Sequence, residues 1–280
     1  MEVYKCETVE KVVGLLGKYK NDGKIIAGGT DILIDLRNKK LDPKVLIDIS
    51  SIEELKTIED NEGFIEIGAG VSFTQIVEDP LFDGSLYGLK KACRLIGSPQ
   101  IRNKGTIGGN IVHGSPAADS IPPMICLDSI LVLESIRGKR EISLEKFFKD
   151  NNGIEEDELL LYIRFKKPKK NEILSFAKLG LRKALAISRI SISTLTEVDN
   201  KGKIKDVKVS SGSLGKYPMR ELEVEDFLLG KPFTEDILDG SVRILQEVMD
   251  NRLAGRSTLP YKRVAVEGIL KESLIEGMKI

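Results

Sequence analysis

Apolar positions in the first 50 residues alternate between the spacing of strands and that of helices. Residues 3–4 start a strand, and Thr8 can cap a helix with apolar residues on one face. A short apolar run over residues 24–27 predicts a buried strand that ends at two glycines, and a second helix and a strand over 45–48 follow. This order predicts a small β-α-β-type unit up to about residue 51.

The chain from residue 53 to about 168 predicts a second lobe of strands and helices. The segment 103–120 is rich in glycine and lacks helical periodicity, so we expect it to form loops. Pro168 lies in a run of lysines over 166–170, which predicts a solvated domain linker, with a docking patch as the alternative. The expected strands cover residues 64–67, 129–134, 140–144 and 158–165, and the expected helices lie near 73–77 and 86–96.

The remainder of the chain, from residue 169 to 280, has a different pattern. Three apolar runs predict strands, and the second and third are joined by a turn over residues 199–202. Three amphipathic segments follow, so the pattern predicts an antiparallel sheet backed by helices. The expected strands are 173–179, 186–198 and 204–210, and the expected helices are 223–229, 234–251 and 260–275.

Composition narrows the functions that this chain can have. Its 280 residues suggest about two domains, and its 43 basic and 43 acidic side chains give no net charge, which argues against binding to nucleic acid. It has one histidine, three widely spaced cysteines and no tryptophan, so we expect neither a metal site nor a catalytic triad. The sequence shows no signal-like start and no apolar run of transmembrane length, so we expect a cytoplasmic protein without membrane insertion.

Two glycine-rich segments are the candidates for cofactor binding. In the first, a strand runs into Gly28 and Gly29 and then into a helix, so the N–H groups of Gly28, Gly29, Thr30 and Asp31 can converge on an anion. The alternative is a tight turn between strand and helix. The second segment, residues 106–110, again combines two glycines with polar side chains. Asp119, which follows this segment, could accept a hydrogen bond from a ribose hydroxyl. Two such segments suit a dinucleotide, although neither has the Rossmann or Walker spacing.

These segments resemble the FAD-binding medium subunit of the molybdenum hydroxylases, a family that includes xanthine, nicotinate and aerobic carbon monoxide dehydrogenases. The resemblance covers essentially the whole chain. It rests on Ala27-Gly28-Gly29-Thr30-Asp31, Thr106-Ile107-Gly108-Gly109-Asn110 with Pro116-Ala117-Ala118-Asp119, Phe176-Ala177-Lys178-Leu179-Gly180, Gly212-Ser213-Leu214, Phe227-Leu228-Leu229-Gly230-Lys231-Pro232 and Tyr261-Lys262-Arg263.

The resemblance implies an α+β fold. It predicts a two-lobed FAD-binding domain of the vanillyl-alcohol-oxidase (PCMH) type over residues 1–168, with lobes of about 1–52 and 53–168, followed by a carbon monoxide dehydrogenase flavoprotein C-terminal-like domain over 169–280. The FAD is expected to be noncovalent. The cofactor-binding residues that the resemblance implies are Ile25, Ile26, Ala27, Gly28, Gly29, Thr30, Asp31, Ile32, Thr106, Ile107, Gly108, Gly109, Asn110, Asp119, Leu160 and Lys178.

The function implied is that of an FAD-dependent oxidoreductase subunit. Electrons would come from a partner [2Fe–2S] small subunit and pass through FAD to NAD⁺ or another acceptor, while a molybdopterin-binding large subunit carries out hydroxylation. Thr30-Asp31 stands where carbon monoxide dehydrogenases tend to have His-Ser, which favours xanthine- or nicotinate-type partners. The alternatives are a stand-alone flavin reductase of the same fold and a noncatalytic nucleotide-binding scaffold.

Overall fold

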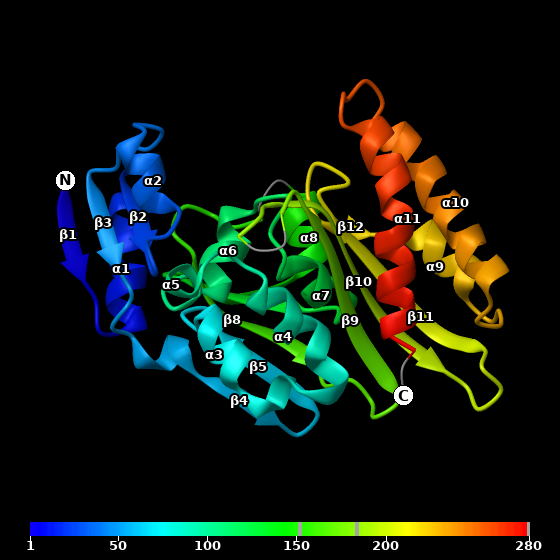
Figure 1. Cartoon of the computed structure of the whole chain (residues 1–280). Helices are drawn as coiled ribbons and strands as arrows, with labels where there is room; N and C mark the ends of the chain where they lie inside the picture. The colour runs from blue at the N-terminus through cyan, green and yellow to red at the C-terminus, as the bar shows by residue number, and fades with distance from the viewer. Residues whose placement is uncertain (151–152, 183–184, 279–280) are drawn as a thin grey trace. The chain divides into compact units, whose positions relative to one another are not determined.

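The fold is seen in a computed structural model that describes residues 1–150, 153–182 and 185–278 (Figure 1). Contacts between residues divide the chain into two compact units. The first unit consists of residues 1–76, 98–114 and 129–167, and the second consists of residues 77–97, 115–128 and 168–280. Two segments that precede residue 168 therefore pack with the C-terminal part, and the domain boundary expected at residue 168 stays a prediction.

A three-stranded parallel sheet begins the first unit. Its order is β1 (Glu2–Lys5), β3 (Val45–Asp48) and β2 (Gly23–Ile26). Helix α1 (Val9–Tyr19) connects β1 to β2, and Thr8 caps it by accepting a hydrogen bond from the Lys11 N–H. The shorter α2 (Ile32–Arg37) follows β2. The β-α-β unit expected from the sequence is present, although the last three residues of β2 are half-buried rather than buried.

A five-stranded antiparallel sheet forms the rest of the first unit. Its order is β4 (Ile58–Asn61), β5 (Phe64–Gly68), β8 (Leu159–Lys166), β6 (Ile130–Ser135) and β7 (Gly138–Ser143). Strand β4 was not expected from the sequence, because three of its four residues are exposed and it carries no alternating apolar pattern. The helices around this sheet are α3 (Phe73–Glu78), α5 (Pro99–Arg102), α6 (Ile107–His113) and α8 (Leu144–Lys149).

Helix α6 corrects the expectation that residues 103–120 form loops. Two adjacent glycines in a seven-residue helix make its intrinsic helical propensity poor, so tertiary contacts must hold it. Ile107 and Ile111 are fully buried, and the Thr106 hydroxyl caps the first turn. The helix was not predicted because glycine has no side chain, so the two glycines add no apolar residue to a helical pattern.

The second unit is built on a four-stranded antiparallel sheet. Its order is β12 (Met219–Arg220), β11 (Ile204–Gly212), β10 (Ser188–Val198) and β9 (Glu172–Gly180). Helices α4 (Tyr87–Arg94) and α7 (Ile121–Cys126) pack on the sheet. Helices α9 (Leu222–Leu228) and α11 (Leu259–Glu276) also pack on the sheet, and α10 (Glu235–Arg252) packs against these two helices (Figure 1). All three helices share a large apolar core with the strands. Short 3₁₀ turns lie at Lys20–Asp22, Glu53–Lys56, Pro80–Phe82 and Gly84–Leu86.

Candidate functional site: a glycine-lined pocket in the first unit

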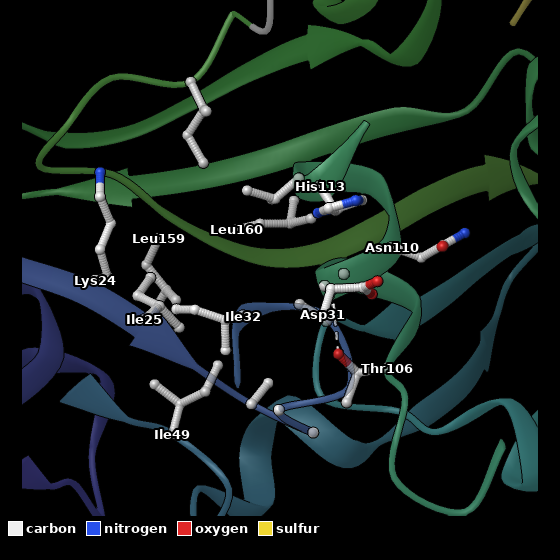
Figure 2. Close-up of a pocket in the computed structure, with 18 of the residues that line it drawn as sticks. Lys24, Ile25, Asp31, Ile32, Ile49, Thr106, Asn110, His113, Leu159 and Leu160 are labelled. Carbon is white, nitrogen blue, oxygen red and sulfur yellow. Dashed lines mark hydrogen bonds between the residues drawn. The ribbon is translucent and has the colours of Figure 1, made fainter. Parts of the chain in front are cut away.

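A pocket of about 500 Å³ opens in the first unit, where both glycine-rich segments meet. This volume lies within the range of roughly 300–1,000 Å³ typical of small-molecule and cofactor sites. Strand β2 and the start of α2 form one wall, α6 forms another, and residues 154–160 close a third side. Figure 2 shows apolar side chains, among them Ile25, Ile49 and Leu159, on one side, and Asp31 and Thr106 on the other.

The structure brings together twelve of the sixteen residues expected to bind the cofactor. The lining includes Ile25, Ala27, Gly28, Gly29, Thr30, Asp31, Ile32, Thr106, Gly108, Gly109, Asn110 and Leu160. Ile26 and Ile107 are their neighbours in the chain, but they do not line the pocket; Ile107 is fully buried in the core. Asp119 and Lys178 belong to the second unit. The role of all sixteen in binding stays a prediction.

Gly28 packs against the backbone just before the second glycine-rich segment. A Cβ atom at this position would lie 1.7 Å from the carbonyl oxygen of Lys104 and 2.5 Å from its carbonyl carbon, so only glycine fits against that backbone. The next residue, Gly29, has φ +73°, a left-handed conformation that glycine adopts without strain. Glycine is therefore required at residue 28 to bring two backbone segments into contact, whereas the sequence predicted it only for close approach to a ligand.

The backbone that follows Gly28 leaves a row of donors open. Among the hydrogen bonds of the described residues, none uses the N–H groups of Gly28, Gly29, Thr30 or Asp31 as donors. Two carbonyl oxygens of this segment do accept hydrogen bonds: that of Gly29 from the Leu33 N–H, and that of Asp31 from the N–H groups of residues 34 and 35. Since all four residues line the pocket, the segment presents unpaired N–H donors in a position to meet an anionic group.

The start of α6 lies against the opposite wall. The Thr106 hydroxyl accepts a hydrogen bond from the Gly109 N–H at 3.1 Å. A Cβ at Gly108 would lie 2.5 Å from the Cβ of Ala69, so this glycine lets the helix pack on the five-stranded sheet. Gly109, in contrast, is exposed, and a Cβ there would meet only the Thr106 hydroxyl. The two glycines thus have different roles: Gly108 serves packing and Gly109 keeps the pocket open.

Several lining residues were not singled out from the sequence. Leu16 and Ile49 belong to the apolar cluster under the three-stranded sheet, and Leu159 opens strand β8. Their apolar pattern reads as ordinary core, so no local signal marks them as pocket residues. His113, the one histidine, ends α6 and also lines the pocket (Figure 2).

Carboxylates also line the pocket, and Glu158 is the most buried of them. Arg140 donates to its two oxygens at 2.5 and 2.7 Å, and the Glu155 N–H donates at 2.7 Å. Burial opposes ionisation here, but the hydrogen bonds from Arg140 and from the backbone more than compensate and lower the pKa of Glu158. This side chain is therefore a fixed negative charge at neutral pH, already neutralised by its arginine.

Asp119 and Lys178 pair with each other in the second unit. The Lys178 Nζ lies 2.5 Å from Asp119 Oδ2 and also donates to the Leu95 carbonyl at 3.2 Å, and the Ser188 hydroxyl donates to Asp119 Oδ1. Both side chains are over nine-tenths buried. Burial raises the pKa of Asp119, and the charge of Lys178 opposes that rise. The pair joins the segment before α7 to strands β9 and β10.

Comparison with known proteins places the chain in a flavoprotein class. A family model for the FAD-binding domain in molybdopterin dehydrogenase matches residues 1–168, and a model for the CO dehydrogenase flavoprotein C-terminal domain matches residues 175–276. The chain belongs to the family of FAD-binding subunits of molybdopterin dehydrogenases, so it is a component of an oxidoreductase and its cofactor is FAD. This confirms the family, the fold class and the cofactor expected from the sequence.

Individual relatives are similar to this chain along nearly the full length of both proteins. The chain is 36% identical to the nicotinate dehydrogenase FAD-subunit of Eubacterium barkeri and 29% identical to a putative xanthine dehydrogenase FAD-binding subunit of Escherichia coli (strain K12), in each case over 98% of this chain and 95% of the relative. A solved carbon monoxide dehydrogenase from Hydrogenophaga pseudoflava superimposes with a TM-score of 0.92 at 27% identity, over 99% of this chain and 96% of that one.

Over residues 1–150, 153–182 and 185–278, no group of three or more histidine, cysteine or acidic side chains is arranged to hold a metal ion. Over the same residues, no helix combines the length and the apolar character needed to cross a bilayer.

Proposed function

We propose that this chain is the electron-transferring FAD subunit of a cytoplasmic molybdenum hydroxylase of the nicotinate or xanthine dehydrogenase type. In this proposal a [2Fe–2S] small subunit supplies electrons, a molybdopterin-binding large subunit oxidises the substrate, and NAD⁺ or another acceptor receives the electrons. The observation that carries the proposal is the meeting of both glycine segments in one pocket lined by open N–H donors. The family membership and the names of the relatives support it.

The pocket fits FAD on three structural grounds. The N–H groups of residues 28–31 are unpaired donors of the kind that bind a pyrophosphate. Gly29 and Gly109 line the pocket without a side chain of their own, and Thr30 adds a hydroxyl to the lining. The apolar wall of Ile25, Ile49 and Leu159 suits an aromatic ring system and excludes water from it.

The bound FAD supplies the one-electron and hydride chemistry, and the residues of this chain bind it, orient it and exclude water. We infer that Thr106 and Asn110 hold the cofactor from the α6 side, opposite the donors of residues 28–31. Asp119, Leu160 and Lys178 are further contacts suggested by the family resemblance. Lys178 is held in place by Asp119, and a buried cation of this kind would stabilise negative charge on a cofactor near it.

Flavin reconstitution tests this proposal. The purified chain should bind FAD far more tightly than riboflavin, with FMN in between, because riboflavin has no phosphate to meet the donors of residues 28–31. Absorbance and fluorescence titration measure the three affinities. Failure to bind any flavin would refute the proposal, and equal affinity for riboflavin and FAD would refute the role of the glycine cradle.

Two further measurements separate the proposal from its alternatives. Anaerobic photoreduction should bleach the flavin of a redox subunit, whereas a nucleotide-binding scaffold would give no flavin signal. Co-purification with molybdenum and iron–sulfur subunits should occur for the proposed complex. A chain that is isolated alone and oxidises NADH rapidly without partners would instead be a stand-alone flavin reductase.

A further inference from the structure

Helix α2 follows the glycine segment of residues 28–31 and is apolar without burying a side chain. Four of its six residues are isoleucine or leucine, yet none of the six is buried, and Leu33 and Ile34 are about half exposed. An isolated helix of six residues is far too short to be stable in water, and the Asp31 side chain makes no capping hydrogen bond to it. Helix α2 therefore depends on apolar packing from a partner.

Hydrogen bonds do not fasten this helix to the rest of the first unit. In the described part of the chain, every hydrogen bond and ion pair of residues 30–41 has its partner within residues 29–41. The Leu33 N–H, for example, donates to the Gly29 carbonyl. Gly29 at φ +73° and Lys39 at φ +56° turn the chain into and out of α2. The segment can therefore shift as a unit without breaking a hydrogen bond to its surroundings.

The inner side of α2 faces the glycine-lined pocket. Ile32, Asp35 and Leu41 are among the residues that line this pocket, and Figure 2 shows Ile32 on the same side of it as Ile25. Residues 33 and 34, in contrast, are exposed and do not line the pocket. A molecule bound in the pocket would therefore add contacts to the side of α2 that the protein leaves half-buried.

Helix α8 shows how a helix of the same length is held by the protein alone. It also has six residues and lies in the first unit, but Leu144, Phe147 and Phe148 are buried and the Ser143 hydroxyl caps its first turn. None of these four residues lines the pocket. The two helices therefore differ in what covers them, because the protein core covers α8 whereas the pocket lies on the inner side of α2.

We propose that residues 30–41 form a lid that closes on FAD, with α2 stably folded only when the bound cofactor packs against Ile32 and Leu41. This inference rests on the proposed FAD site of the first unit. In the flavin-free protein the lid opens easily, because α2 has few contacts to lose, and the open lid admits the cofactor. The lid closes when FAD is bound, and the closed lid excludes water from the pocket.

Hydrogen exchange followed by mass spectrometry tests the lid in the full chain, with and without FAD. In the flavin-free protein, we expect the amides of α2 to be at least about tenfold less protected than those of α8, since α2 opens locally. At a free FAD concentration of about 100 times its Kd, linkage allows exchange to slow by up to about 100-fold, and we expect at least about tenfold for α2. Absorbance titration under the same conditions measures FAD binding independently.

Two matched variants test whether the inner side of α2 carries the effect. Ile32→Ser removes an apolar side chain from the pocket, so FAD should bind at least about fivefold more weakly and should protect α2 less. Ile34→Ser makes the same substitution at an exposed residue that does not line the pocket. Because isoleucine and serine have similar helix propensities, this control should match the unmodified protein in FAD affinity and in the protection of α2.

The outcomes separate the lid from the FAD site itself. Three results would each overturn the lid and leave the proposed function intact: FAD that binds without slowing exchange in α2, equal protection of α2 and α8 in the flavin-free protein, and equal FAD affinity of Ile32→Ser and Ile34→Ser. Failure of the unmodified chain to bind FAD would overturn the proposed function and the lid together.

Discussion

Replacing Gly28 with alanine places a methyl group where the backbone of Lys104 already lies. The new Cβ would be 1.7 Å from the Lys104 oxygen, about half of an ordinary van der Waals separation of ~3.5 Å. The obstacle is main chain, so no side-chain rotation can relieve the overlap, and the two segments must move apart. Overpacking costs about 1–3 kcal/mol, and a backbone collision belongs at the upper end. We therefore expect G28A to lose about 3 kcal/mol of unfolding free energy.

Thermal unfolding and FAD titration measure this effect. At ~2–4 °C per kcal/mol for a chain of this size class, the Tm of G28A should fall by about 6–12 °C. FAD affinity should fall as well, because the donors of residues 28–31 follow the displaced glycine. The matched control is G14A, in helix α1 of the same unit, where nothing lies within 4 Å of the new methyl group. It should gain roughly 0.5–1 kcal/mol from helix propensity. A G28A protein with unchanged Tm and FAD affinity would refute the contact with Lys104.

Three further predictions follow from the site and its surroundings. Thr106→Val removes the hydroxyl that caps α6 and should cost about 1 kcal/mol in urea unfolding, whereas Thr106→Ser should keep the cap; equal losses would argue against capping. Lys178→Met leaves Asp119 buried without its cation and should cost about 3–5 kcal/mol at pH 7. Without the Lys178 charge the pKa of Asp119 rises further, so the buried carboxyl destabilises the folded variant more as pH rises and the carboxyl ionises. The loss of unfolding free energy in Lys178→Met should therefore be smaller at pH 5 than at pH 7. A loss that does not depend on pH would contradict this. Burial raises the pKa of Cys126 to about 12 and also raises that of Cys93, so neither thiol should react with Ellman's reagent at pH 8 until the protein unfolds.

The sequence predicted the elements whose apolar pattern is regular. Helix α1 and strands β9 to β11 lie close to their expected positions, because each buries a continuous apolar face against one core. Two of the elements that were missed, β4 and α6, lack such a face. Strand β4 is mostly exposed, and α6 consists partly of glycine, so both are held by partners elsewhere in the chain. The local pattern of apolar residues does not predict contacts between segments that are distant in the sequence.

The candidate site shows the same division. The two glycine segments and most of the expected binding residues were visible in the sequence, since glycine beside threonine and a strand end is a local signal for close backbone approach. The apolar wall was not visible, because Leu16, Ile49 and Leu159 have the spacing of ordinary core residues. Only packing decides which apolar side chains face a cavity.

The amino-acid sequence by itself determined the strands and helices with a regular apolar pattern, the absence of net charge and the family to which the chain belongs. These properties depend on local periodicity, composition and short motifs, which are all features of the sequence itself. Tertiary structure alone decided that Gly28 packs on Lys104 and that Asp119 pairs with Lys178. Each of these joins residues far apart in sequence, so their distances are set by how whole sheets and helices pack.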